Sequence, residues 1–120
     1  RMRSDIQTIK DHTEKATLPD KAKKYLLEII GRKEMDILFE PGWNVYTEQE
    51  IKNEDGKIFR PDRIMKNENK VRIIDFKTGT PAVSHKKQMD NYVRVLKSMG
   101  FEIESSVLIY LSDPFKIVRL

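Results

Sequence analysis

The spacing of hydrophobic residues predicts two helices separated by a run of strands. One helix is predicted over residues 20–30, where Leu18-Pro19-Asp20 is a start signal and Gly31 a stop. Another is predicted from Ser84, as its N-cap, to about Met99, and its buried stripe comprises Met89, Tyr92, Val93, Leu96 and Met99. A short helical stretch that ends at Pro41-Gly42 carries Met35, Leu38 and Phe39.

Alternating or continuous apolar runs predict five strands, over residues 43–52, 57–65, 71–77, 103–111 and 115–120. The first three are joined by tight turns, since Asp55-Gly56 and Asn67 to Lys70 are turn sequences, and they form an antiparallel meander. The second and third strands are apolar on both faces, as central strands are. A helix that follows a meander and leads into a further strand predicts an α/β fold, with a central mixed sheet flanked by helices.

Charged residues interrupt the apolar hairpin of the second and third strands. If this hairpin closes symmetrically about Glu68-Asn69, Asp62 lies opposite Asp75, and Lys77 shares their face because side chains alternate along a strand. Two carboxylates so close raise one another's pKa unless a cation lies between them, and a hard divalent ion such as Mg²⁺ or Mn²⁺ fits that position. A register slip of one residue would separate the cluster.

Composition narrows the chemistry of this cluster. The 120 residues suit one domain, and no apolar run reaches the roughly 20 residues of a membrane span. The absence of cysteine excludes disulfides and thiolate metal sites, and with only His12 and His85 a histidine-rich site is excluded too. Any metal must therefore be held mainly by carboxylates. The net charge of +4 fits a polyanionic partner or a solvated lysine-rich surface.

Four motifs in order resemble a known nuclease group. Pro61-Asp62 followed by Asp75-Phe76-Lys77 resembles the PD-(D/E)XK nuclease superfamily, and Gln88-Met-Asp-Asn-Tyr92 and Arg60-Pro-Asp-Arg-Ile64 resemble its RecB-like branch. The resemblance covers roughly residues 43–111 and is closest to the C-terminal nuclease domain of UvrD/Rep-type helicases, as in the exonuclease V beta subunit and AddA-like proteins. It implies a restriction-endonuclease-like core.

The resemblance also implies roles for the clustered residues. Asp62, Asp75 and the main-chain carbonyl of Phe76 would bind Mg²⁺ (or Mn²⁺), which would polarise the scissile phosphate and lower the pKa of a bound water. Lys77 would orient the nucleophile and stabilise charge on the phosphate. Gln88 and Tyr92 would buttress the site and touch the DNA backbone, although Tyr92 also fits a plain core residue.

Three further residues, Glu48, Arg63 and His85, each have two possible roles. Glu48 would support the metal through water, or lies on a solvated edge together with Glu50. Arg63 points away from the aspartates and is expected to contact a phosphate or a helix. His85 is expected either at the surface or in contact with a phosphate.

One departure concerns a metal-binding histidine that RecB-like domains carry on an N-terminal helix. The segment 20–30 has none, and His12 lacks the small and apolar neighbours typical of that ligand. Because the chain opens with Arg1, we expect residues 1–120 to be one nuclease domain excised from a larger helicase–nuclease, with the histidine upstream. Without that ligand the fragment would bind metal weakly and cut DNA poorly.

The functional expectation is a Mg²⁺-dependent DNA nuclease domain, part of a bacterial cytoplasmic ATP-dependent helicase–exonuclease in DNA end processing and recombinational repair. The helicase domains of the same chain, and a second subunit, would be its partners, with no membrane involved. The alternative is a catalytically incomplete module of the same fold for DNA binding or scaffolding. A stand-alone resolvase or restriction-type enzyme is the third reading.

Overall fold

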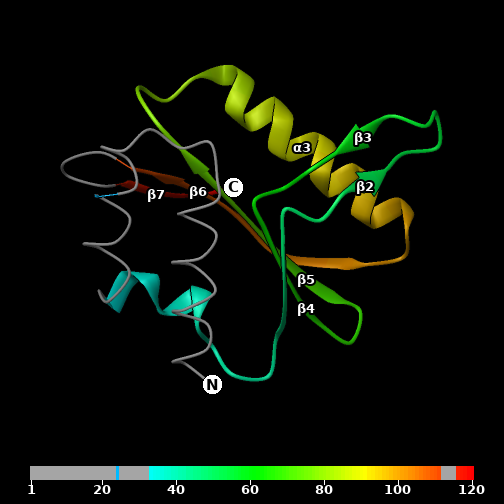
Figure 1. Ribbon diagram of the computed structural model, residues 1–120, viewed down its shortest axis with the longest axis horizontal. Coiled ribbons are helices and arrows are strands. Elements are labelled where there is room, and N and C mark those ends of the chain that lie inside the picture. Colours follow the sequence, from blue (N-terminus) through cyan, green and yellow to red (C-terminus); the bar gives the residue numbers. More distant parts are fainter. Residues whose placement is uncertain (1–23, 25–32, 112–115) are drawn as a thin grey trace.

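The computed structural model describes Lys24, residues 33–111 and residues 116–120 (Figure 1). The elements in chain order are η1 (Lys33–Leu38), β1 (Asn44–Thr47), β2 (Ile51–Lys52), β3 (Ile58–Phe59), β4 (Arg63–Asn67), β5 (Lys70–Lys77), α3 (Val83–Ser98), β6 (Glu102–Tyr110) and β7 (Lys116–Arg119). The predicted helix over 20–30, apart from Lys24, and residues 112–115 lie outside the described residues.

Five strands form one mixed sheet in the order β1-β4-β5-β6-β7. The β1–β4, β4–β5 and β6–β7 pairs are antiparallel, whereas β5 and β6 are parallel. Parallel neighbours need a crossover connection, and α3 provides it, lying along one face of the sheet (Figure 1). The predicted α/β fold with a central mixed sheet is confirmed. No helix within the described ranges has the length and apolar character needed to cross a membrane.

The first two predicted strands are each interrupted, which corrects the expectation of two long continuous strands. Segment 43–52 divides into β1 and β2, and segment 57–65 divides into β3 and β4. Glu48 has a positive φ of 52°, and Pro61 has no N–H to donate to a ladder. The β2–β3 pair is therefore a separate two-stranded ribbon.

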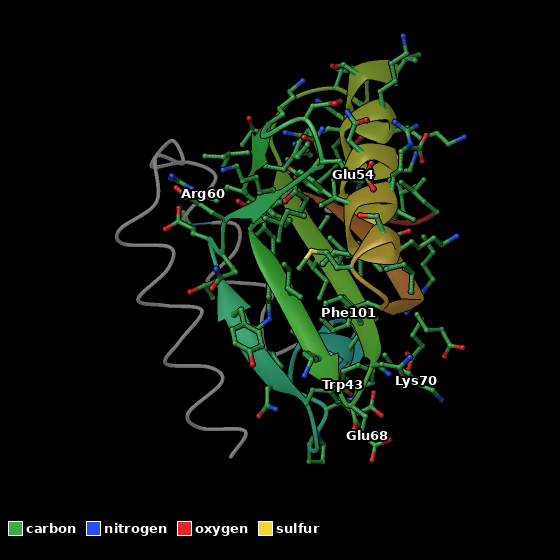
Figure 2. The ribbon with its side chains drawn as sticks, turned by 90° about the vertical axis from the view of Figure 1, so that its right-hand side faces the viewer. Trp43, Glu54, Arg60, Glu68, Lys70 and Phe101 are labelled. Carbon is green, nitrogen blue, oxygen red and sulfur yellow. The ribbon has the colours of Figure 1, made fainter. Side chains whose placement is uncertain are left out.

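The ribbon nevertheless continues the register of the β1–β4 hairpin. Thr47 pairs with Arg63 and Ile51 pairs with Phe59, and between these pairs the Glu48 N–H donates to the Asp62 carbonyl at 3.0 Å. The interruption bends the hairpin without slipping it, so the ribbon lies beside α3 (Figure 1). Figure 2 shows Glu54 of the ribbon near α3, and Trp43, Glu68 and Lys70 together at the other end of the sheet.

Hydrophobic side chains cover both faces of the central strands, as predicted. The core on the α3 face comprises Ile51, Ile64, Val71, Ile73, Met89, Tyr92, Val95, Leu96, Leu108 and Tyr110. The opposite core comprises Leu38, Phe39, Met65, Ile74, Phe76, Val107, Ile109 and Leu111. Segment 33–39 thus supplies core residues, as its sequence indicated.

Details of α3 differ from the predicted helix. Its N-cap is Ala82 rather than Ser84, and its C-cap is Met99, followed by Gly100 with a φ of 95°. Val95 is buried, whereas Met99, the C-cap residue at the helix end, is 53% exposed. The buried stripe therefore keeps Met89, Tyr92 and Leu96 as predicted, with Val95 in place of Met99 and Val93 only partly buried.

Candidate active site at the end of the β4–β5 hairpin

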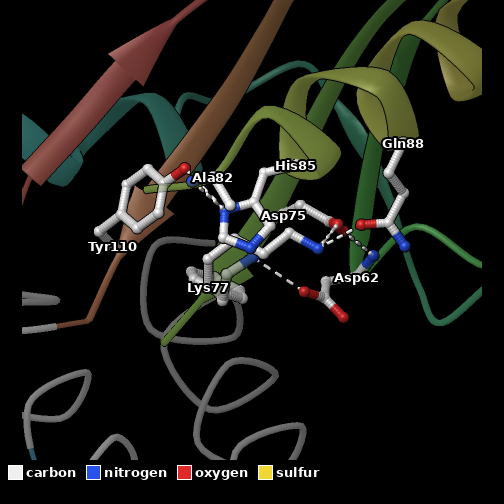
Figure 3. Close-up of polar contacts among 8 residues, drawn as sticks. Asp62, Asp75, Lys77, Ala82, His85, Gln88 and Tyr110 are labelled. Atoms are coloured by element: carbon white, nitrogen blue, oxygen red, sulfur yellow. Dashed lines mark hydrogen bonds and ion pairs between the residues drawn. The ribbon is translucent and has the colours of Figure 1, made fainter. Parts of the chain in front are cut away.

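The β4–β5 register sets the position of the two aspartates. Ile64 pairs with Ile73 and Arg63 with Ile74, which confirms closure about Glu68-Asn69. One step further along the same register, Asp62 faces Asp75. The Asp62 N–H donates to Oδ1 of Asp75 at 2.8 Å (Figure 3). The sheet therefore brings the two carboxylates together, as the pattern predicted.

Pro61 explains why the ladder ends at this point. In the same register Pro61 lies opposite Phe76, and proline has no N–H for the strand beside it. The N–H of Phe76 donates instead to Oδ2 of Asp62 at 2.8 Å. Because the N–H and C=O of a strand residue face the same neighbour, the Phe76 carbonyl also faces this end of β4. Three oxygen-bearing groups thus face one region: two carboxylates and a main-chain carbonyl.

Lys77 ties the carboxylates to α3. It lies two residues after Asp75 on β5, and its Nζ is 3.1 Å from Oδ2 of Asp75. The same Nζ donates to Oε1 of Gln88, an exposed residue of α3 (Figure 3). Both side chains are largely enclosed, that of Lys77 being 17% exposed and that of Asp75 4%. The ammonium is therefore held by two partners from two different elements.

The electrostatics of the pair favour uptake of positive charge. Burial, followed by the negative charge of Asp75, raises the pKa of Asp62 to about 7, against smaller opposing effects from the Phe76 N–H and the Lys77 charge. Burial also raises the pKa of the Tyr92 hydroxyl, and the charges of Asp75 and Asp62 add to the effect. Lys77 alone thus compensates the two carboxylates incompletely.

Tyr92 is a core residue, and it also lies close enough to Asp75 and Asp62 to be affected by their charges. It is 3% exposed within the α3-face core, and its ring meets Phe59 of the ribbon edge-on at 6.2 Å between centroids. Gln88, one turn earlier on α3, is exposed and reaches Lys77 instead. Only Gln88 of the two is open to a ligand.

Arg63 is not a phosphate contact. It is 1% exposed, and its Nη2 donates to the carbonyl of Leu38, the last residue of η1, at 2.6 Å. Its neighbours on β4 alternate faces, so the residue after Asp62 must point into the opposite core. A DNA contact by Arg63 is therefore wrong, and its expected helix contact is the one observed.

His85 and Glu48 also acquire defined surroundings. His85 is half-buried, and its Nδ1 lies 2.9 Å from Oη of Tyr110 and accepts from the Ala82 N–H at 3.4 Å. With Nδ1 accepting from the main chain, the Tyr110 hydroxyl is the other donor. Sequence reasoning missed Tyr110, because it is brought there only by the parallel β5–β6 pairing, opposite Lys77.

Glu48 is exposed and contributes its N–H, not its carboxylate, to Asp62.

The donor set suits Mg²⁺ or Mn²⁺ as a partial ligand sphere. Across the described residues, no three His, Cys, Asp or Glu side chains lie close enough together to hold a metal. Mg²⁺, however, is commonly bound through one or two carboxylates, with waters and substrate phosphates completing its sphere. Asp62 and Asp75 fit that pattern, since burial and then the charge of Asp75 raise the pKa of Asp62. His12 lies outside the described residues.

Comparison with known proteins finds likeness among solved structures alone. No protein-family model matches the chain, and no curated protein matches it. Among solved structures, the crystal structure of SSO0001 is similar, with 18% sequence identity and a TM-score of 0.46 over 98% of this chain and 74% of that chain. A likeness of this size carries no conclusion about function.

Proposed function

We propose that this chain is a metal-dependent DNA nuclease domain with a restriction-endonuclease-like core, which hydrolyses phosphodiester bonds with Mg²⁺ or Mn²⁺. The observation that carries the proposal is the joining of Asp62, Asp75, Lys77 and Gln88 by direct contacts at one end of the β4–β5 hairpin. The mixed sheet with crossover helix α3 and parallel β6 is compatible with such a core.

The residues divide the work by their chemistry. Asp62 and Asp75, with the Phe76 carbonyl beside them, would hold the cation, which when bound supplies Lewis acidity toward a phosphate oxygen. Lys77 is a compact cation whose position is fixed by Asp75 and Gln88, so it stabilises negative charge that develops on the phosphate without first reorganising. Gln88 acts by positioning Lys77. A phosphodiester suits this site because it brings a negative charge to an ammonium and a cation.

The decisive comparison is between Asp75→Asn and Asp90→Asn. Both remove one carboxylate with little change in size, but Asp90 is exposed on α3, away from the cluster. With an end-labelled oligonucleotide and Mg²⁺, Asp75→Asn should reduce cleavage about 100-fold or more, since loss of several kcal/mol of charge stabilisation corresponds to that factor. Asp90→Asn should cleave like the unaltered chain. Equal cleavage by the two variants would refute the assignment.

Association with helicase domains, end processing, recombinational repair and the bacterial cytoplasm form the part of the proposal that rests on the sequence resemblance alone. In a longer chain that carries helicase domains, Asp75→Asn should stop DNA degradation and leave ATP hydrolysis intact. Loss of both activities would argue against a separate nuclease role for Asp75.

A non-catalytic DNA-binding or scaffolding module is the second candidate. The observation that favours it is the enclosure of the site: Asp75 is 3% exposed, and no third acidic or histidine ligand joins the pair among the described residues. This candidate predicts salt-dependent DNA binding and no cleavage with either Mg²⁺ or Mn²⁺. Cleavage that depends on Asp75 would exclude it.

A further inference from the structure

A basic hollow of about 510 Å³ lies between the β2–β3 ribbon and the first half of α3. Its described lining is Lys57, Phe59, Ser84, His85, Lys87, Gln88 and Asn91. None of these residues is acidic, and the two lysines come from two different elements, Lys57 from the ribbon side and Lys87 from the helix. The hollow therefore presents positive charge and hydrogen-bond donors with no lining carboxylate to neutralise them.

The hollow adjoins the candidate active site through Gln88. This side chain lines the hollow and also accepts the hydrogen bond from Lys77. An extended molecule with a phosphate at Lys77 would therefore meet the hollow next. The neighbouring depression shares Phe59 and Asn91 but has mixed charge, because Glu54, Asp55 and Arg94 line it. Anionic groups are accordingly favoured more near Lys57 and Lys87 than in that depression.

Phe59 holds the ribbon side of the hollow in place. Its ring packs edge-on against Tyr92 of α3, and Nζ of Lys57 lies 5.2 Å from its centroid. A cation over an aromatic face is attracted by the ring quadrupole, so the exposed Lys57 ammonium is drawn toward the Phe59 ring. Ser84 and Asn91 on α3 add hydroxyl and amide groups that hydrogen-bond to phosphate or sugar oxygens.

We propose that this hollow binds the phosphate backbone of the nucleic acid strand next to the phosphate at Lys77, with Lys57 and Lys87 as its two phosphate contacts. The inference rests on the proposed function for the identity of the strand. It adds that the strand is held beyond the cleaved bond, and that the ribbon, which lies outside the main sheet, is part of the binding surface.

The test compares two double variants of the whole chain. Lys57→Gln with Lys87→Gln removes both proposed contacts, and Lys52→Gln with Lys97→Gln removes the same charge from the same ribbon and the same helix at exposed positions outside the hollow. Binding of a labelled oligonucleotide, single-stranded or duplex, is measured in EDTA across a salt series. Because EDTA removes the metal, binding is separated from cleavage.

The Lys57/Lys87 variant should bind about tenfold or more weakly near 0.1 M salt, with a salt slope smaller by roughly 1.4–1.8, corresponding to two lost phosphate contacts. The Lys52/Lys97 variant should change the slope by much less. Equal effects of the two variants, or no binding by the unaltered chain, would overturn the proposal. Lysine-dependent binding without any cleavage would support the hollow and refute the nuclease function.

Discussion

Asp62 and Asp75 are bonded through main chain and side chain at once, since the Asp62 N–H donates to Oδ1 of Asp75 and the N–H following Asp75 donates to Oδ2 of Asp62. Each carboxylate thus fixes the backbone that carries the other. This arrangement destabilises the ionised pair, because two negative charges then lie close together in a largely buried region. The first two predictions concern this destabilisation.

Stability should fall with rising pH because of Asp62. Its pKa is raised from 3.8 to about 7, so the folded state binds the proton more tightly than the unfolded state does. The resulting stabilisation is complete below about pH 4 and is lost as the pH rises through about 7. Denaturant unfolding at pH 5 and pH 8 should show a larger loss of unfolding free energy for the unaltered chain than for Asp62→Asn. Parallel losses in the two proteins would contradict the prediction.

Divalent metal should reverse this loss. A cation that binds only the folded state raises the melting temperature by mass action. At pH 8, millimolar Mg²⁺ should therefore raise the melting temperature of the unaltered chain, and EDTA should remove the increase. Asp62→Asn and Asp75→Asn should show little response, and Asp90→Asn should respond fully. The same rise in all four proteins would indicate a general salt effect.

Arg63 should be important for folding and irrelevant to DNA. Replacing it by Met fills much of the volume but leaves the Leu38 carbonyl without its donor, and loss of a buried charged hydrogen bond costs about 2–3 kcal/mol. Urea unfolding measures this change. The slope of DNA affinity against salt should stay unchanged, because the side chain is buried. A smaller salt slope for DNA binding, at unchanged stability of the Arg63→Met variant, would instead indicate that Arg63 contacts a phosphate.

Two substitutions of Tyr92 distinguish the packing of its ring from the role of its hydroxyl. Tyr92→Ala should destabilise the chain by about 3–5 kcal/mol, as truncation of a large buried aromatic does. Tyr92→Phe keeps the edge-on contact with Phe59 and should cost no more than about 1 kcal/mol. If the hydroxyl serves the site as well, Tyr92→Phe cleaves more slowly at nearly unchanged stability. Normal cleavage by Tyr92→Phe would leave Tyr92 as a core residue alone.

Features set by residues close in sequence could be predicted, and features set by long-range pairing could not. The β4–β5 register follows from a short polar turn and two apolar runs, so the meeting of Asp62 and Asp75 was predictable from residues close in sequence. The interruptions at Glu48 and Pro61 were not, because a charged residue at positive φ and a buried proline become favourable only through the bend that they permit. The nearness of His85 to Tyr110 depends on the β5–β6 pairing, which is non-local and shifts register between Val71 and Arg72.

The bent hairpin has a consequence for sequence variation. The main sheet fixes the position of Asp62 through its own bonds to Glu48 and Asp75, so the far end of the ribbon does not set it. Residues added in matched pairs to β2 and β3 would lengthen the ribbon and leave the two carboxylates in place. We therefore expect the exposed tip near Glu54 to tolerate insertions. A longer ribbon would contact more of a bound strand without moving the two aspartates.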